Sequence, residues 1–148
     1  MDRFYVFFVL SAIAAHLCTA SKFEDCGSTA KVNSVNISGC PDSADVCPLI
    51  RGTDASITIA FKSNSDAKSL KAVVYGIISF VPLPFPLPQS DGCKSGVSCP
   101  VQNGQSYIYS NKLKVRKSYP SLSVTVKWML KDEKSNNLVC IKIPCKLQ

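Results

Sequence analysis

Residues 121–131, Ser-Leu-Ser-Val-Thr-Val-Lys-Trp-Met-Leu-Lys, are the stretch that decides the fold. Side chains alternate along it. One face carries Leu122, Val124, Val126, Trp128 and Leu130, and the other carries Ser121, Ser123, Thr125, Lys127 and Lys131. A period of two is typical of a strand with one buried face, because successive side chains of a strand point to opposite sides. We therefore predict a half-buried strand here.

The same period recurs along the rest of the chain, and no stretch offers a helical stripe. It predicts further strands over residues 30–37, 56–61, 70–78, 106–115 and 139–143. Clusters of Gly, Pro, Asn, Asp and Ser separate them, which marks turns. About seven short strands in one domain indicate an all-β protein, an immunoglobulin-like β-sandwich of two antiparallel sheets.

Residues 81–88 have a proline at every second position, from Pro82 to Pro88. Proline has no amide proton for a sheet ladder, so this stretch cannot be a central strand. We expect it to be extended and stiff, and to display Leu83, Phe85 and Leu87 together. Two interpretations stay open: a rigid connector that caps the core, or an apolar lip on a ligand cavity.

The first 20 residues are typical of a signal peptide. Arg3 precedes an apolar run from Phe4 to Leu17, and small residues lead to cleavage after Ala20, leaving a mature domain over 21–148. The only histidine, His16, leaves with the leader. Histidine-dependent nucleophiles and histidine-ligated zinc are then excluded, so we expect no enzyme, no metal and no cofactor.

Cysteine and charge describe the exported domain further. Eight cysteines less Cys18 leave seven, which predicts three disulfides and one free thiol. The chain carries a net charge of +7. Lys112, Lys114 and Arg116 share one face of a predicted strand. That face is either simply solvated or attracted to an anionic membrane surface, and nucleic acid is not expected as a partner of an exported protein.

Several motifs carry a resemblance to a known family. Residues 71–77 (Lys-Ala-Val-Val-Tyr-Gly-Ile), 81–86 (Val-Pro-Leu-Pro-Phe-Pro) and 91–96 (Asp-Gly-Cys-Lys-Ser-Gly) resemble the soluble Niemann-Pick type C sterol carriers of the ML-domain (lipid-recognition) family. The resemblance runs from Asp25 to the end of the chain. It implies a monomer of the lysosomal lumen and secreted fluids. In this reading, cholesterol or a related unesterified sterol lies in a lipid cavity between the two sheets.

The resemblance also implies roles for individual residues. The disulfides would be Cys26–Cys140, Cys40–Cys47 and Cys93–Cys99. Sterol would contact Phe85, Val115 and Tyr119 near the mouth and Trp128 deeper inside. A loop of eight residues would face the membrane Niemann-Pick type C transporter: Tyr75, Gly76, Ile77, Ile78, Ser79, Phe80, Val81 and Pro82. Asn36, in the chain's one N-x-S/T sequon, would carry a glycan for lysosomal delivery.

Two departures from the family pattern leave alternatives open. Cys145 has the same strand parity as Ile141 and Ile143, so we expect a buried free thiol there. Ile141 stands where a tryptophan is common, which could enlarge the cavity. A binding protein for other lipids (fatty acid, phospholipid, glycolipid or a hydrophobic signal molecule) is therefore the alternative function. An adhesion or immune sandwich with a packed core is a third hypothesis.

Overall fold

The computed structural model describes residues 20–148. The predicted signal peptide, apart from Ala20, lies outside these residues. All six strands predicted from the alternation are present: β2 (Lys31–Ile37), β4 (Thr53–Lys62), β5 (Lys71–Ile78), β7 (Ser106–Val115), β8 (Ser123–Lys131) and β9 (Asn137–Leu147). Over the described part of the chain, no helix has the length and apolar character needed to cross a bilayer.

Three short strands join these six: β1 (Glu24–Asp25), β3 (Cys47–Leu49) and β6 (Val81–Phe85). A single 3-10 turn, η1 (Gly92–Lys94), follows β6. The sequence did not predict β1 and β3, because two or three residues are too few to display a period. Both strands exist only through pairing with β9.

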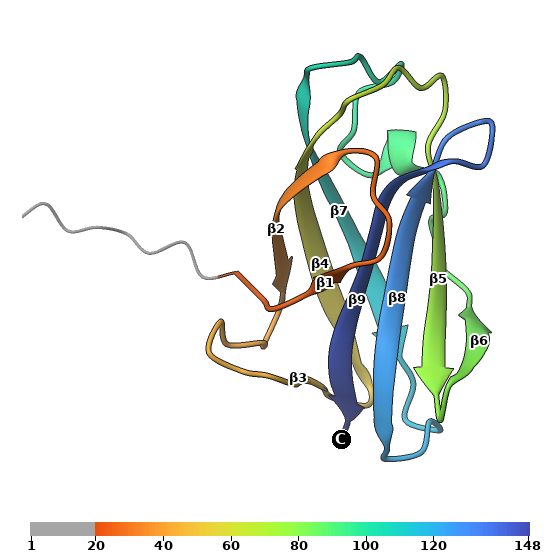
Figure 1. The fold of residues 1–148 in the computed structure, drawn as a ribbon. Helices are drawn as coiled ribbons and strands as arrows, with labels where there is room; N and C mark the ends of the chain where they lie inside the picture. The colour runs from red at the N-terminus through yellow and green to blue at the C-terminus, as the bar shows by residue number, and fades with distance from the viewer. Residues whose placement is uncertain (1–19) are drawn as a thin grey trace, which may run out of the picture.

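The strands form two facing sheets, as predicted for a β-sandwich (Figure 1). One sheet has the order β1-β9-β8-β5-β6, with β3 also paired to β9, and the other has the order β2-β4-β7. Pairing is antiparallel except between β3 and β9, which run parallel. The sheets leave an open side where β6 ends one sheet and β7 ends the other.

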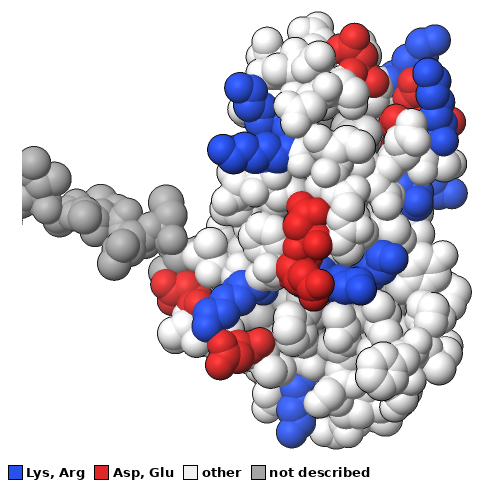
Figure 2. All heavy atoms as spheres, in the orientation of Figure 1, with Lys and Arg blue, Asp and Glu red and all other residues white. Residues whose placement is uncertain are grey.

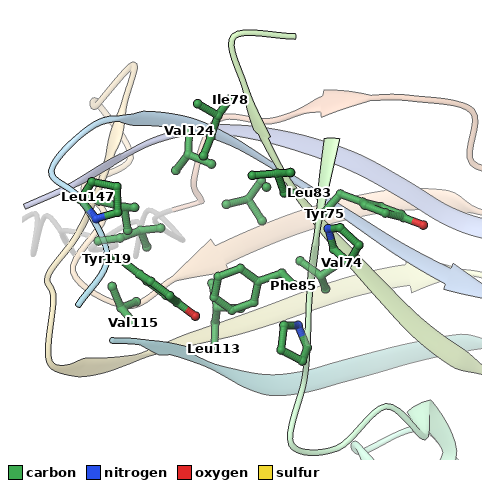
Figure 3. A pocket seen from close by; sticks show the side chains of 16 residues that line it. Val74, Tyr75, Ile78, Leu83, Phe85, Leu113, Val115, Tyr119, Val124 and Leu147 are labelled. Carbon is green, nitrogen blue, oxygen red and sulfur yellow. The ribbon is translucent and has the colours of Figure 1, made fainter. Parts of the chain in front are cut away.

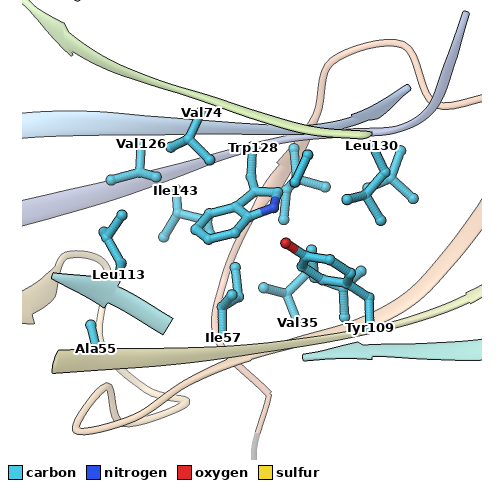
Figure 4. Close-up of a cluster of buried hydrophobic side chains, with 14 of the residues drawn as sticks. Val35, Ala55, Ile57, Val74, Tyr109, Leu113, Val126, Trp128, Leu130 and Ile143 are labelled. Atoms are coloured by element: carbon cyan, nitrogen blue, oxygen red, sulfur yellow. The ribbon is translucent and has the colours of Figure 1, made fainter. Parts of the chain in front are cut away.

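The core lies between the sheets, where the alternation predicted it (Figure 4). Val35, Ile57 and Tyr109 come from the smaller sheet and meet Trp128 and Ile143 from the larger one. The Tyr109 and Trp128 rings make an edge-to-face contact with centroids 6.0 Å apart. This packing fills the middle of the sandwich.

The proline run forms an edge strand. Residues Val81–Phe85 pair with β5 on one side only, and Pro82 and Pro84 lie opposite Ile77 and Tyr75. An edge is where a strand tolerates residues that cannot donate to a ladder. The prediction that this stretch is not a central strand is confirmed.

The eight-residue loop expected from Tyr75 to Pro82 is a β-hairpin instead. Tyr75–Ile78 end β5, Val81 and Pro82 begin β6, and the turn itself is only Ser79 and Phe80. Both turn residues have positive φ, 48° and 68°. Tight hairpin turns with this backbone usually carry Asn or Gly. Neither is present at these positions, so no residue in the sequence marked this turn.

Within residues 20–148, three disulfides are present: Cys26–Cys140, Cys40–Cys47 and Cys93–Cys99. These are the pairs that the resemblance implied. Cys145 is left as a buried free thiol, 2% exposed, on the same face of β9 as Ile141 and Ile143. Pro144 does not break the strand, and the parity argument for Cys145 is confirmed.

Candidate functional site

An elongated cavity of about 310 Å³ lies between the sheets beside the open side of the sandwich (Figure 3). The larger sheet supplies one wall through β5, β6 and β8, and β7 of the smaller sheet supplies the other. The larger sheet contributes Val74, Ile78, Leu83, Phe85, Val124 and Val126, and β7 contributes Leu113 and Val115. Leu49 of β3 and Leu147 of β9 also line the cavity. Tyr119 and Pro120, from the connection between β7 and β8, complete the lining. Its volume is at the lower end of the range usual for small-molecule sites.

The cavity wall is almost purely apolar. No Asp, Glu, Lys or Arg side chain lines it, and its side-chain polar atoms are the hydroxyls of Tyr75 and Tyr119. The Tyr75 hydroxyl points away from the cavity (Figure 3). Water gains few hydrogen bonds in such a space, whereas an apolar ligand loses its unfavourable hydration there. The site can therefore hold an apolar molecule and offers no acid, base or nucleophile to it.

Two aromatic rings meet at the cavity wall (Figure 3). Phe85 and Tyr119 make an edge-to-face contact, with ring centroids 5.7 Å apart and planes inclined by 71°. Both side chains are only partly buried, so they lie where the cavity reaches the surface. Movement of either ring changes the width of the opening.

Of the four residues expected to contact sterol, Phe85, Val115 and Tyr119 line this cavity. Trp128 does not. It is 1% exposed and borders a smaller inner void of about 10 Å³, which shares Leu49, Leu113 and Val126 with the main cavity. Its large ring fills the space beyond Val126, so it closes the inner end of the cavity instead of forming its side wall.

The sequence did not predict several of the residues that line the cavity. Val124 and Val126 were expected to face inward, but only as core. Leu49 and Leu147 had no signal at all, because they meet through the short parallel pairing of β3 with β9. Gly76 also lines the cavity, and a Cβ atom there would lie 3.3 Å from Val124. Glycine at this position avoids a crowded contact with Val124 in the cavity wall.

Ile141 lies in the core opposite Trp128 in the β8–β9 register and is fully buried. It is not part of the cavity wall. The expected widening by Ile141 therefore finds no support, because the side chain lies in the core beside Trp128 and outside the cavity wall.

Cys145 borders the small inner void and pairs in register with Val124. Burial raises the pKa of its thiol to about 12, and the thiol donates to the Ile143 carbonyl at 3.5 Å. A protonated, buried thiol is a small apolar group in practice. Cys145 therefore contributes packing at the inner end of the site.

The hairpin that lines the cavity also presents apolar side chains outward. Phe80 is 99% exposed and Val81 is 55% exposed. Phe80 and Val46 border a second, shallower groove of about 300 Å³ on the outer side of β8 and β9. On the face seen in Figure 2, the region over β6 and the hairpin carries no charged side chains. An exposed apolar patch of this kind is typical of a contact surface.

The basic face predicted on β7 is present. Lys112, Lys114 and Arg116 are exposed, whereas Leu113 and Val115 between them are buried and line the cavity. One strand thus contributes to the apolar site on one side and to the positive surface on the other.

Together, fold and site define a small β-sandwich that encloses an apolar, charge-free cavity between its sheets. The chain belongs to the ML-domain family, because the sequence model of that domain matches residues 20–147. NPC intracellular cholesterol transporter 2 of Bos taurus is 44% identical over 145 residues, which cover 97% of this chain and 95% of the relative. The homolog a of that transporter from Drosophila melanogaster is 41% identical, covering 87% and 88%.

A solved structure agrees with the sequence comparisons. The crystal structure of a Niemann-Pick type C2 protein from the Japanese carpenter ant superimposes with a TM-score of 0.81 at 34% identity, covering 86% of this chain and all of that one. The family expected from the sequence motifs is confirmed, and so is the β-sandwich fold.

Proposed function

We propose that this chain is a carrier that binds unesterified cholesterol or a related sterol in its cavity and hands it to a membrane or to a membrane transporter. The charge-free cavity between the sheets is the observation that carries the proposal. The relatives named as cholesterol transporters support it. The chemistry is that of binding and release, with no covalent step, so the chain acts as a carrier and not as an enzyme.

The energetics suit such a carrier. Burying on the order of 400 Å² of sterol surface at about 25 cal/mol/Å² gives a gross gain near 10 kcal/mol. The loss of translational and rotational freedom on binding costs several kcal/mol of this gain. What remains is binding that is tight but reversible.

Transfer needs a surface as well as a cavity. We assign contact with the membrane transporter to the hairpin from Tyr75 to Pro82, because its apolar tip projects beside the site. We assign the first encounter with anionic membranes to the basic face formed by Lys112, Lys114 and Arg116, since positive charge attracts acidic lipid. The carrier would act as a monomer.

Export and lysosomal delivery complete the proposal. Residues 1–20 would direct secretion, and Asn36 would carry the glycan. Asn36 is exposed on β2 and pairs with Thr58 on the outer face of the smaller sheet, where a glycan has room.

Lipid extraction and mass spectrometry of the protein purified from secreting cells test the function. Unesterified sterol in near-stoichiometric amount is the expected result. Acyl lipids without sterol would instead support a binding protein for other lipids. An empty protein that also takes up no fluorescent sterol would support a sandwich without a carrier role.

A further inference from the structure

Two turns meet beside the opening of the cavity. Residues 50–53 connect β3 to β4 and are closed by the Thr53 amide, which donates to the Ile50 carbonyl at 3.3 Å. Residues 116–119 follow β7 and are closed by the Tyr119 amide, which donates to the Arg116 carbonyl at 3.1 Å. The second turn carries Tyr119, one of the two rings at the mouth.

The turns are in close contact through Gly52. Its amide donates to the Val115 carbonyl at 2.6 Å. Its φ of +83° belongs to the left-handed region, and a Cβ atom there would lie 2.9 Å from the Lys117 side chain. The positive φ favours glycine at this position, and the Lys117 side chain packs directly over it, so the first turn lies against the second.

Arg51, the neighbour of Gly52, connects this contact to the mouth. Its Nη1 donates to the Tyr119 carbonyl at 3.1 Å. Within residues 20–148, no other group donates to that carbonyl. The Arg51 amide donates to the Gln148 carbonyl at 2.8 Å, so the backbone of Arg51 is itself held.

The position of the Tyr119 backbone determines where its ring lies. Pro120 follows directly and biases Tyr119 toward an extended conformation. The ring then rests against Phe85 across the opening. If the carbonyl is released, only the hydrogen bond within residues 116–119 still holds this turn, and the ring can swing away from Phe85.

We propose that Arg51 is a positioning residue for the opening of the cavity. Its guanidinium holds the 116–119 turn so that Tyr119 closes against Phe85, and it thereby sets how fast a ligand enters and leaves. The choice of sterol as the ligand rests on the proposed function, whereas the link between Arg51 and Tyr119 does not.

The first test needs no ligand. Amide hydrogen exchange over residues 116–122 is compared among the wild type, Arg51→Ala and Lys114→Ala. Lys114 is the matched control, because it is an exposed basic residue on β7 whose side chain makes no hydrogen bond to the turn. Arg51→Ala should speed exchange about two- to tenfold, the effect of one lost hydrogen bond. Exchange equal to that of the wild type would overturn the proposal.

The second test measures release of the fluorescent sterol dehydroergosterol from loaded protein to neutral phosphatidylcholine vesicles. Neutral acceptors remove the attraction of basic residues to acidic lipid. Arg51→Ala should release sterol about two- to tenfold faster than the wild type. Its uptake rate should rise as well, so Kd should change less than either the release rate or the uptake rate. Arg51→Lys keeps the charge and an N–H donor for the Tyr119 carbonyl, so it should release sterol more slowly than Arg51→Ala.

Three results would contradict a positioning role. Release from Arg51→Lys as fast as from Arg51→Ala would mean that a hydrogen bond to the Tyr119 carbonyl does not set the release rate. Equal acceleration of release in Lys114→Ala would assign the effect to the loss of positive charge. A lower melting temperature of Arg51→Ala with an unchanged release rate would make Arg51 merely structural. If the wild type takes up no sterol, the proposed function fails, and hydrogen exchange still decides on Arg51.

Discussion

Phe85 is the residue at which binding and stability can be separated. It lines the cavity, is only partly buried, and stands between Pro84 and Pro86, which stiffen its backbone. Phe85→Ala should weaken sterol binding by about 1–3 kcal/mol, roughly ten- to a hundredfold, because a large apolar contact is lost. Titration with a fluorescent sterol measures the loss.

Phe61 is the matched control for that substitution. It is fully buried in the core and does not touch the cavity. Phe61→Ala should lower the free energy of unfolding by about 3–5 kcal/mol. Phe85→Ala should lower the melting temperature less than Phe61→Ala does. Normal sterol binding with a collapsed melting temperature in Phe85→Ala would place that ring in the core.

Cys145 should be the one thiol that alkylation labels in the denatured, unreduced mature protein (residues 21–148). In the native protein labelling should be slow, because burial raises the pKa to about 12 and the thiolate is the reactive form. The native rate should therefore rise with pH throughout the range below 12. Label on Cys26 or Cys140 would contradict the observed pairing.

The raised pKa of Cys145 also predicts how stability changes with pH. The folded thiol keeps its proton to about pH 12, whereas the ordinary value is 9.0. Its contribution to stability is therefore complete below pH 9 and is lost as the pH rises from 9 toward 12. Urea unfolding should show this decline for the wild type relative to Cys145→Ala. Parallel pH profiles of the two proteins would refute it.

At the scale of elements, the β5–β6 hairpin combines two features that usually disfavour folding. Phe80 is fully exposed, and it occupies the left-handed region, which costs an L-residue roughly 1–2 kcal/mol. Phe80→Gly should therefore leave stability unchanged or higher and leave equilibrium sterol affinity nearly intact. It should slow sterol transfer to membranes or to the transporter. An equal loss of equilibrium affinity would place Phe80 in the cavity wall.

At the scale of the whole molecule, the disulfides differ in how much chain they close. Cys26–Cys140 spans 114 residues and joins the residue after β1 to β9, whereas Cys40–Cys47 spans 7. Loop-closure entropy predicts losses of about 5 kcal/mol for Cys26→Ala with Cys140→Ala and about 2 kcal/mol for Cys40→Ala with Cys47→Ala. Urea unfolding of the two double variants measures both. Equal losses in the free energy of unfolding of the two double variants would mean that the ends of the denatured chain stay close together even without the Cys26–Cys140 disulfide.

The sequence by itself determined the six longer strands and their faces. Alternation placed Trp128 and Val126 inside, put Leu113 and Val115 opposite the lysines of β7, and assigned Cys145 to the buried side. The spacing of prolines excluded 81–88 from the sheet centre. These features are local, because the side-chain period and the missing amide protons act within one strand. The family motifs added the disulfide pairs and three cavity residues.

Only the tertiary structure decided which inward positions surround empty space. The alternation of side chains predicts that Val126 and Trp128 both face inward. The local distance between the sheets decides that Val126 lines a cavity whereas Trp128 fills the core. Leu49 and Leu147 reach the wall through pairing between strands about a hundred residues apart. The bond from Arg51 to the Tyr119 carbonyl likewise joins two turns that share no local pattern. Such contacts depend on the packing of the complete sandwich, which no single segment encodes.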